Sequence, residues 1–173
     1  MRILFVTSEH PSHVFGGLGV FSREFTQELK KHCTVKVVFL NIGPQIPPEP
    51  DELVDVVLVT RFAFAAYSTE ARSLENAASF RAQMEPLLAE FRPDIIHCND
   101  RQTFLPFRFD RNVVYSSHLL YTDLQTLQLI DDVYFLEHKV EQCALRNSTA
   151  IIAYSRFAAD RISKMIPEKV APL

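Results

Sequence analysis

The sequence of 173 residues contains no tryptophan, four glycines and only three cysteines. Cys33, Cys98 and Cys143 are odd in number and form no CxxC pair, so neither a disulfide framework nor a zinc knuckle is supported. No apolar run approaches the ~20 residues that a membrane-spanning helix needs. The chain also passes from Met1 directly into a short apolar run, which indicates no cleaved leader. We therefore expect a cytoplasmic protein without a membrane span.

The sequence also lacks a strong charge of either sign. It has 18 Lys and Arg against 21 Asp and Glu, a formal net charge of -3 with histidine neutral, and its basic residues are scattered. Such a chain has no general attraction to nucleic acid or to anionic lipid, so we expect no nucleic-acid partner. Hydrophobic residues make up 47% of the sequence, which is enough for one core, and residues 1–173 are expected to form a single domain.

Three of the four glycines fall within four residues, at Gly16, Gly17 and Gly19. They separate an apolar run at 3–6 from an amphipathic stretch that begins near Leu18. This spacing is typical of a tight turn from a strand into a helix, where backbone amides can face an anion or a sugar. The alternative interpretation is that the glycines only allow a helix to approach a strand closely.

Two common glycine motifs do not fit this turn. The dinucleotide fingerprint needs GxGxxG and an acid near the end of the second strand, but the second apolar run ends at Leu40-Asn41. A P-loop needs a lysine and a hydroxyl after its last glycine, where this chain has Val20-Phe21. A nicotinamide cofactor and an ordinary triphosphate site are both disfavoured.

Short apolar runs alternate with longer amphipathic segments. The runs predict strands at 3–7, 35–40, 54–60, 94–97, 112–116 and 150–154. Apolar stripes at helical spacing predict helices between them, one through Leu18, Phe21, Phe25 and Leu29, the other through Phe80, Met84, Leu87, Leu88 and Phe91. Together they predict a doubly wound α/β fold, a Rossmann-like parallel sheet with helices on both faces. The stretch 44–50 reads as a surface loop, and residues 121–137 fit a helix, a loop or both.

Polar residues follow four of the expected strands. In a doubly wound sheet, ligands bind at the carboxyl ends of the strands, so these residues should meet at one rim. They are Ser8-Glu9-His10 after the first strand, Asn99-Asp100-Arg101 after the fourth, Ser117-His118 after the fifth and Tyr154-Ser155-Arg156 after the sixth. We expect a functional site there.

The same segments resemble those of a known family. The opening from Met1 to Glu9, an interposed proline and then Gly16-Gly17-Leu18-Gly19 resemble the start of glycogen and starch synthases and related group 1 glycosyltransferases (families 4 and 5) of the GT-B fold. Residues 92–100 are similar to the "PDVVHAHD" segment of that group, and residues 116–119 to its "TIHN" segment. Residues 147–162 are similar to its "TVS" strand and helix.

The resemblance implies the N-terminal, acceptor-side half of a retaining glycosyltransferase. Such an enzyme transfers a glycosyl group from an NDP-sugar to a saccharide or other acceptor, with the NDP-sugar as co-substrate and no bound cofactor. A C-terminal donor-binding domain would lie beyond Leu173, so the isolated chain is expected to be inactive. The implied site residues are His118 and Asp100 as catalytic candidates, Gly16, Gly17 and Leu18 for the donor diphosphate and sugar, and Glu9, Asn99 and Ser155 lining the acceptor side of the cleft.

The chain departs from the family pattern at three positions. Val14 replaces a lysine, Asn99 replaces a histidine and Arg101 replaces a tryptophan. The missing lysine supports an alternative hypothesis, a stand-alone non-catalytic carbohydrate- or nucleotide-binding module or a regulatory subunit with the same fold. The rim around Phe15, Leu18 and Leu119 would expose apolar surface, which favours self-association.

Several of these residues also have purely structural interpretations. Asp100 and His118 could be helix caps or loop residues. His97 is better interpreted as a buried, hydrogen-bonded histidine than as a catalytic one. His10 and His13 form an HxxH pair without a third ligand, so we expect no metal site.

Overall fold

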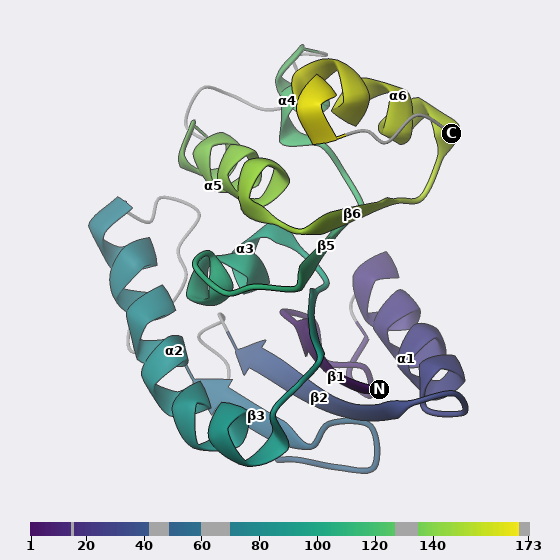
Figure 1. Cartoon of the computed structure of the whole chain (residues 1–173), viewed down its shortest axis with the longest axis vertical. Helices are drawn as coiled ribbons and strands as arrows, with labels where there is room; N and C mark the ends of the chain where they lie inside the picture. Colours follow the sequence, from purple (N-terminus) through teal and green to yellow (C-terminus); the bar gives the residue numbers. More distant parts are fainter. Residues whose placement is uncertain (15, 42–48, 60–69, 127–134, 170–173) are drawn as a thin grey trace.

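A computed structural model describes residues 1–14, 16–41, 49–59, 70–126 and 135–169. Its centre is a six-stranded parallel sheet in the order β3-β2-β1-β4-β5-β6 (Figure 1). The strands are β1 (Arg2–Thr7), β2 (Thr34–Asn41), β3 (Val56–Val59), β4 (Ile95–Cys98), β5 (Val113–Ser117) and β6 (Ala150–Ala153). The doubly wound, Rossmann-like fold predicted from the sequence is confirmed.

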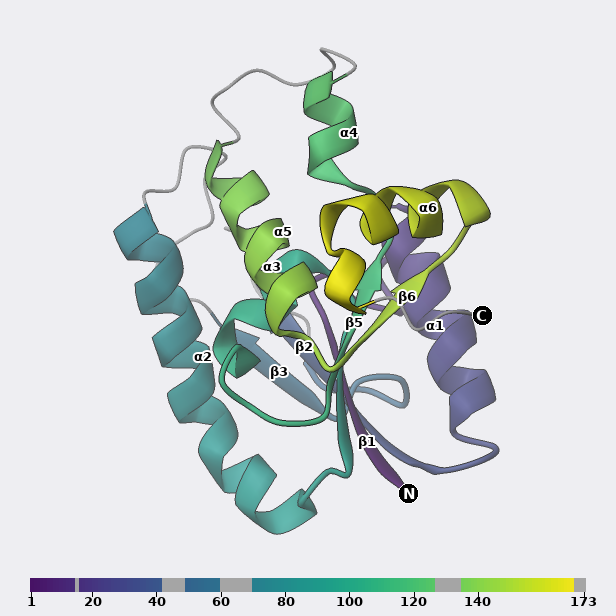
Figure 2. The same ribbon diagram turned by 45° about the horizontal axis from the view of Figure 1, so that its top comes forward.

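Helices cover both faces of the sheet. α1 (Gly17–Leu29) lies on one face, and α2 (Glu70–Phe91), α3 (Arg101–Phe104) and α5 (Phe135–Asn147) lie on the other (Figure 2). The short α4 (Tyr121–Thr126) follows β5, and α6 (Arg156–Met165) follows β6. The undecided segment 121–137 thus begins with α4 and ends in α5, while its residues 127–134 and most of the loop 44–50 lie outside the described residues. Among the described helices, none has the length and apolar character that a membrane span requires.

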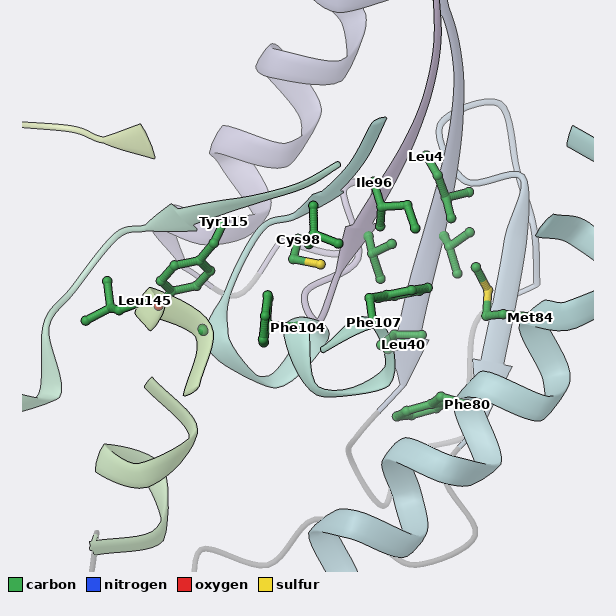
Figure 3. Close-up of a cluster of buried hydrophobic side chains, with 14 of the residues drawn as sticks. Leu4, Leu40, Phe80, Met84, Ile96, Cys98, Phe104, Phe107, Tyr115 and Leu145 are labelled. Carbon is green, nitrogen blue, oxygen red and sulfur yellow. The ribbon is translucent and has the colours of Figure 1, made fainter. Parts of the chain in front are cut away.

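The larger core lies between the sheet and the helices α2, α3 and α5 (Figure 3). It is built from apolar side chains that are almost fully buried, including Leu4, Met84, Phe104, Phe107 and Tyr115. Burying apolar surface of this kind is the main favourable contribution to folding. This face of the sheet therefore supplies much of the stability that holds the rim in place.

The face under α1 differs from the prediction. Phe21, Phe25 and Leu29 are only half-buried and pack around Phe5, whereas the residues of α1 that are fully buried are Gly19, Ser22 and Thr26. The two hydroxyls can be buried because each donates to a helix carbonyl, Ser22 to Leu18 and Thr26 to Ser22, both at 2.7 Å. Small residues thus bring α1 close to the sheet.

The strand predicted at 54–60 is shorter than expected, and β3 begins at Val56. Asp51 Oδ1 accepts hydrogen bonds from the backbone amides of Leu53 (2.8 Å) and Val54 (2.9 Å). This local turn captures the amides that an extended strand would need. Val54 remains buried, but as part of the turn rather than of the sheet, and Thr60 lies outside the described residues.

Candidate functional site

The polar segments singled out in the sequence all leave the carboxyl ends of β1, β4, β5 and β6, which neighbour one another in that order. The chain reverses its direction of winding between β1 and β4. In doubly wound sheets a crevice forms at this point, and ligands bind there. The predicted rim therefore lies at the place where sheets of this class bind their ligands.

The glycine turn lies under the side chain of Glu9. The Gly16 amide, at the N-terminal cap of α1, donates a hydrogen bond to Glu9 Oε1. A Cβ at Gly19 would lie 2.9 Å from that same oxygen, so a larger residue there would displace the Glu9 carboxylate, whereas a Cβ at Gly17 would meet nothing within 4 Å. A carboxylate at this end of α1 is favoured by the helix dipole. The turn and Glu9 therefore lie together at the carboxyl end of β1.

Asp100 joins the loops that follow β1 and β4. Its Oδ1 accepts hydrogen bonds from the amides of Gln102 (2.7 Å) and Thr103 (2.9 Å), which caps α3. Its Oδ2 accepts from the Ser8 amide at 3.3 Å and from the Ser8 hydroxyl. Asp100 is thus a helix cap, which is the structural role considered for it from the sequence. Its carboxylate also links the loop after β4 to the loop after β1, at the point where the winding of the sheet reverses.

The side chain of His118 contacts that of Asn99. The His118 Nε2 atom lies 2.9 Å from Asn99 Oδ1, and Asn99 Nδ2 donates to Ser22 Oγ at 2.8 Å. Asn99 is completely buried, whereas His118 remains exposed at the rim. Because no surface of Asn99 reaches the solvent, its side chain acts on the rim through His118.

Two aromatic rings hold the imidazole of His118. Tyr154, which follows β6, stacks on it with ring centroids 4.5 Å apart, and Phe21 of α1 meets it edge to face at 4.8 Å. The Tyr154 hydroxyl lies 2.7 Å from Ser116 Oγ, which in turn lies 2.6 Å from His97 Nε2. His97 is buried and hydrogen-bonded, as its structural interpretation predicts.

Burial governs the titration of both histidines. Partial burial of the ring lowers the pKa of His118, an effect that the Asp100 carboxylate and a hydrogen bond with the backbone of Asn99 partly offset. Burial, with a smaller contribution from His118, lowers the pKa of His97 to about 4. Both rings are therefore neutral at pH 7, and the rim presents an uncharged imidazole beside the Asp100 carboxylate.

The remaining predicted residues have more local surroundings. Ser155 Oγ accepts a hydrogen bond from the Ala158 amide at 3.1 Å and caps α6. The rings of His10 and His13 lie 5.0 Å apart, and across the described ranges no three His, Cys, Asp or Glu side chains gather as metal ligands. Leu119 is 53% exposed and Leu18 is half-buried, while Phe15 lies outside the described residues. Self-association through this rim stays a prediction.

Sequence reasoning missed Ser22 and Tyr154 as parts of the site. Tyr154 stood in a segment that was assigned to the rim, and the signal that could have selected it is an aromatic residue at the end of the sixth strand. Ser22 has a weaker signal, the spacing of Gly19, Ser22 and Thr26 on one face of α1. Its role depends on which strand α1 packs against, and the local sequence does not contain that information.

The rim thus combines helix-terminal amides, a carboxylate and a neutral imidazole held in a fixed orientation. Backbone amides at a helix N-terminus can bind an anion, and oriented polar groups can stabilise charge that develops during a reaction. Hydroxyl-rich ligands are suited to such a surface because carboxylates and imidazoles accept hydrogen bonds from hydroxyl groups.

Comparisons with known proteins identify the family and support the fold. Residues 15–172 match the family model described as Glycosyltransferase Family 4. The fold is similar to that of sucrose-phosphate synthase from Thermosynechococcus elongatus, with a TM-score of 0.68 and 16% sequence identity. The match covers 94% of this chain and 44% of that protein's chain, so this chain spans less than half of that length. A comparison with curated protein sequences gives no match.

Proposed function

Because the chain belongs to glycosyltransferase family 4, we propose that it is the N-terminal, acceptor-side domain of a retaining glycosyltransferase. The reaction is the transfer of a glycosyl group from an NDP-sugar to a saccharide or another acceptor. The NDP-sugar serves as co-substrate, no bound cofactor is needed, and a C-terminal domain supplies most of the donor site. The compartment is the cytoplasm.

The strongest support is the meeting of His118, Asp100 and the glycine turn at one rim, in a chain of this family. Loss of a nucleoside diphosphate from a sugar develops positive charge on the sugar ring and negative charge on the leaving group. A neutral imidazole and nearby carboxylates suit the first, and helix-terminal amides suit the second. The groups at the rim thus match both charges.

The roles follow from these surroundings. His118 contacts the transferred sugar and is the catalytic candidate on this domain. Asp100 supplies negative charge nearby while its oxygens hold α3 and Ser8, so it acts by positioning the loops. The amides of Gly17 and Leu18 face the donor diphosphate, since the Gly16 amide is bound to Glu9. Glu9 and Ser155 face the acceptor.

The test is sugar transfer by the protein encoded in the full reading frame, with UDP-, ADP- and GDP-sugars each supplied as donor. Replacing His118 by alanine is expected to lower kcat/KM about 100-fold, the size of effect that one oriented stabilising group contributes. The matched control is His32→Ala, because the His32 side chain is 71% exposed and lies just beyond α1, at the end opposite the glycine turn.

The two variants separate the possible outcomes. Undiminished turnover by His118→Ala removes His118 from the mechanism. A wild-type protein that binds a sugar nucleotide or saccharide but transfers nothing with any donor favours the non-catalytic binding module instead. Equal losses in His118→Ala and His32→Ala would trace the effect to damaged folding rather than to chemistry.

A further inference from the structure

We propose that Ser22 and Asn99 are positioning residues that hold His118 as the Nε2–H tautomer, so that Nδ1 accepts a hydrogen bond from a hydroxyl of the sugar. The first part, the tautomer, depends only on the contacts within this chain. The second part, the hydroxyl ligand, rests on the proposed function. Each part has its own measurement below.

The contacts form a continuous line from α1 to the rim. Ser22 Oγ donates to the Leu18 carbonyl at 2.7 Å, and Asn99 Nδ2 donates to Ser22 Oγ at 2.8 Å. Asn99 Oδ1 then faces His118 Nε2 at 2.9 Å. Asn99 comes from the loop after β4 and Ser22 from α1, so the line crosses from the helix to the edge of the sheet.

The direction of each hydrogen bond follows from counting hydrogens. A serine hydroxyl has one hydrogen, and that of Ser22 is used by the Leu18 carbonyl. Ser22 Oγ can then only accept from Asn99, which requires the NH₂ group of Asn99 on this side and its carbonyl oxygen on the other. An oxygen that faces Nε2 needs a donor there, so His118 carries its hydrogen on Nε2.

The reverse orientation is disfavoured because Asn99 is completely buried. Turning the amide would place Oδ1 against Ser22 Oγ and force that hydroxyl to leave the Leu18 carbonyl. An unsatisfied polar group at such a site costs about 1–3 kcal/mol.

The charged and titratable groups around His118 agree with a neutral ring. Asp100 beyond β4 is the nearby carboxylate, His97 of β4 is a buried neutral imidazole, and Tyr154 beyond β6 stacks on the ring. The α1 side presents the apolar ring of Phe21. Burial outweighs Asp100, and the pKa of His118 lies below its ordinary value of about 6.5.

The Nε2–H tautomer of His118 determines which kind of ligand group the ring can bind. With its only N–H directed at Asn99, the neutral ring of His118 has no hydrogen left to donate to a phosphate oxygen. Nδ1 is left with a lone pair, which a sugar hydroxyl can use as an acceptor. His118 therefore contacts the sugar of the donor and leaves the diphosphate to the amides of the glycine turn.

The tautomer is measured directly by ¹⁵N NMR of the imidazole nitrogens in the 173-residue protein. At pH 7.5, above the pKa, His118 is expected to show a protonated-type shift at Nε2 and a deprotonated-type shift at Nδ1. Ser22→Ala removes the group that orients Asn99, and both tautomers should then appear. A wild-type ring protonated at Nδ1, or a Ser22→Ala spectrum identical to that of the wild type, would overturn the proposal.

A second variant adds charge without changing shape. Asn99→Asp places a carboxylate beside Nε2 and should raise the pKa of His118, measured by NMR titration, by about one pH unit or more. The matched control is Asn147→Asp, since Asn147 is exposed on α5 and its amide bonds to Cys143 of the same helix. Equal effects of the two variants on His118 would contradict the proposed contact.

The hydroxyl ligand is tested in the protein encoded by the full reading frame, with UDP-glucose, ADP-glucose and GDP-mannose against the matching nucleoside diphosphates. A sugar nucleotide that binds should shift the Nδ1 resonance of His118, and its nucleoside diphosphate alone should not. An equal shift with the diphosphate alone would overturn the sugar contact. Failure of all three to bind counts against the proposed function and leaves the tautomer result standing, because the two are read from different samples.

Discussion

The sheet carries different kinds of side chain on its two faces. Toward α2, α3 and α5 the buried residues are mostly apolar, with Met84, Phe104 and Phe107 among them (Figure 3). Toward α1 a smaller apolar cluster around Phe5 lies beside buried polar groups, of which Ser22, His97 and Asn99 form hydrogen bonds that lead to the rim. One face is built for burial, and the other also orients polar groups.

The difference predicts how substitutions will act. Apolar packing is non-directional, so losing one side chain from the α2 face should lower the free energy of unfolding and leave the orientation of the rim intact. Buried hydrogen bonds have direction, so losses on the α1 face should alter protonation and orientation at His118 as well as stability.

The largest expected effect is on the apolar face. Phe107 is fully buried, and Phe107→Ala should lower the free energy of unfolding by about 3–5 kcal/mol, measured by urea denaturation. The control is Phe109→Ala, two residues away, because Phe109 is 87% exposed and its loss should cost less than about 0.5 kcal/mol. Similar losses of unfolding free energy in the two variants would show that the stability of this face does not depend on burying Phe107.

The next largest effect is a dependence of stability on pH, which arises from His97 on the α1 face. The pKa of His97 is about 4 in the folded protein against about 6.5 in the unfolded chain, so between these values only the unfolded chain binds the proton. Stability should therefore fall by about 3 kcal/mol as the pH drops from 6.5 to 4, and this contribution should level off below pH 4.

The measurement is the difference in unfolding free energy between the wild type and His97→Gln across that range. The glutamine variant should lack the His97 contribution while keeping the carboxylate contributions that both proteins share. His32→Gln, which alters an exposed histidine, serves as the control. A constant difference between wild type and His97→Gln from pH 6.5 to 4 would show that His97 titrates normally and is not held neutral by burial.

The smallest effect compares two helix caps. Asp100→Ala should destabilise the protein by about 2 kcal/mol, because the carboxylate caps α3 and also binds Ser8 across the β1–β4 boundary. Ser155→Ala removes only the cap of α6 and should cost about 1 kcal/mol. Thermal unfolding of the two variants checks the order. A Ser155 variant less stable than the Asp100 variant would mean that the contact with Ser8 contributes nothing.

Much of the fold could be predicted because parallel strands covered on both faces are apolar throughout. Runs such as that at Ile3–Val6 mark their strands without any knowledge of neighbours, and all six strands are found where the runs lie. The prediction was less accurate where a side chain competes with the backbone. Asp51 captures two amides and shortens β3, and buried Ser22 and Thr26 replace the expected apolar contact of α1.

The sequence could predict where the candidate site lies in the fold, but not which of its side chains contact one another. The glycine turn, Asp100 and His118 each follow a recognisable strand, so the rim could be found from the sequence. Which groups touch depends on the strand order and on where α1 packs, and neither is written in a local pattern. The contacts of His118 with Asn99 and Tyr154 needed the structure for that reason.

The bond between Asp100 and Ser8 has a mechanical consequence for the rim. It ties together the two loops at the reversal point, so they cannot separate unless the charge-assisted hydrogen bonds from Ser8 to the Asp100 carboxylate break. This part of the rim is consequently stiff. Adjustment to a bound molecule is then expected in the more exposed side chains of the rim, such as Leu119, which can turn about single bonds.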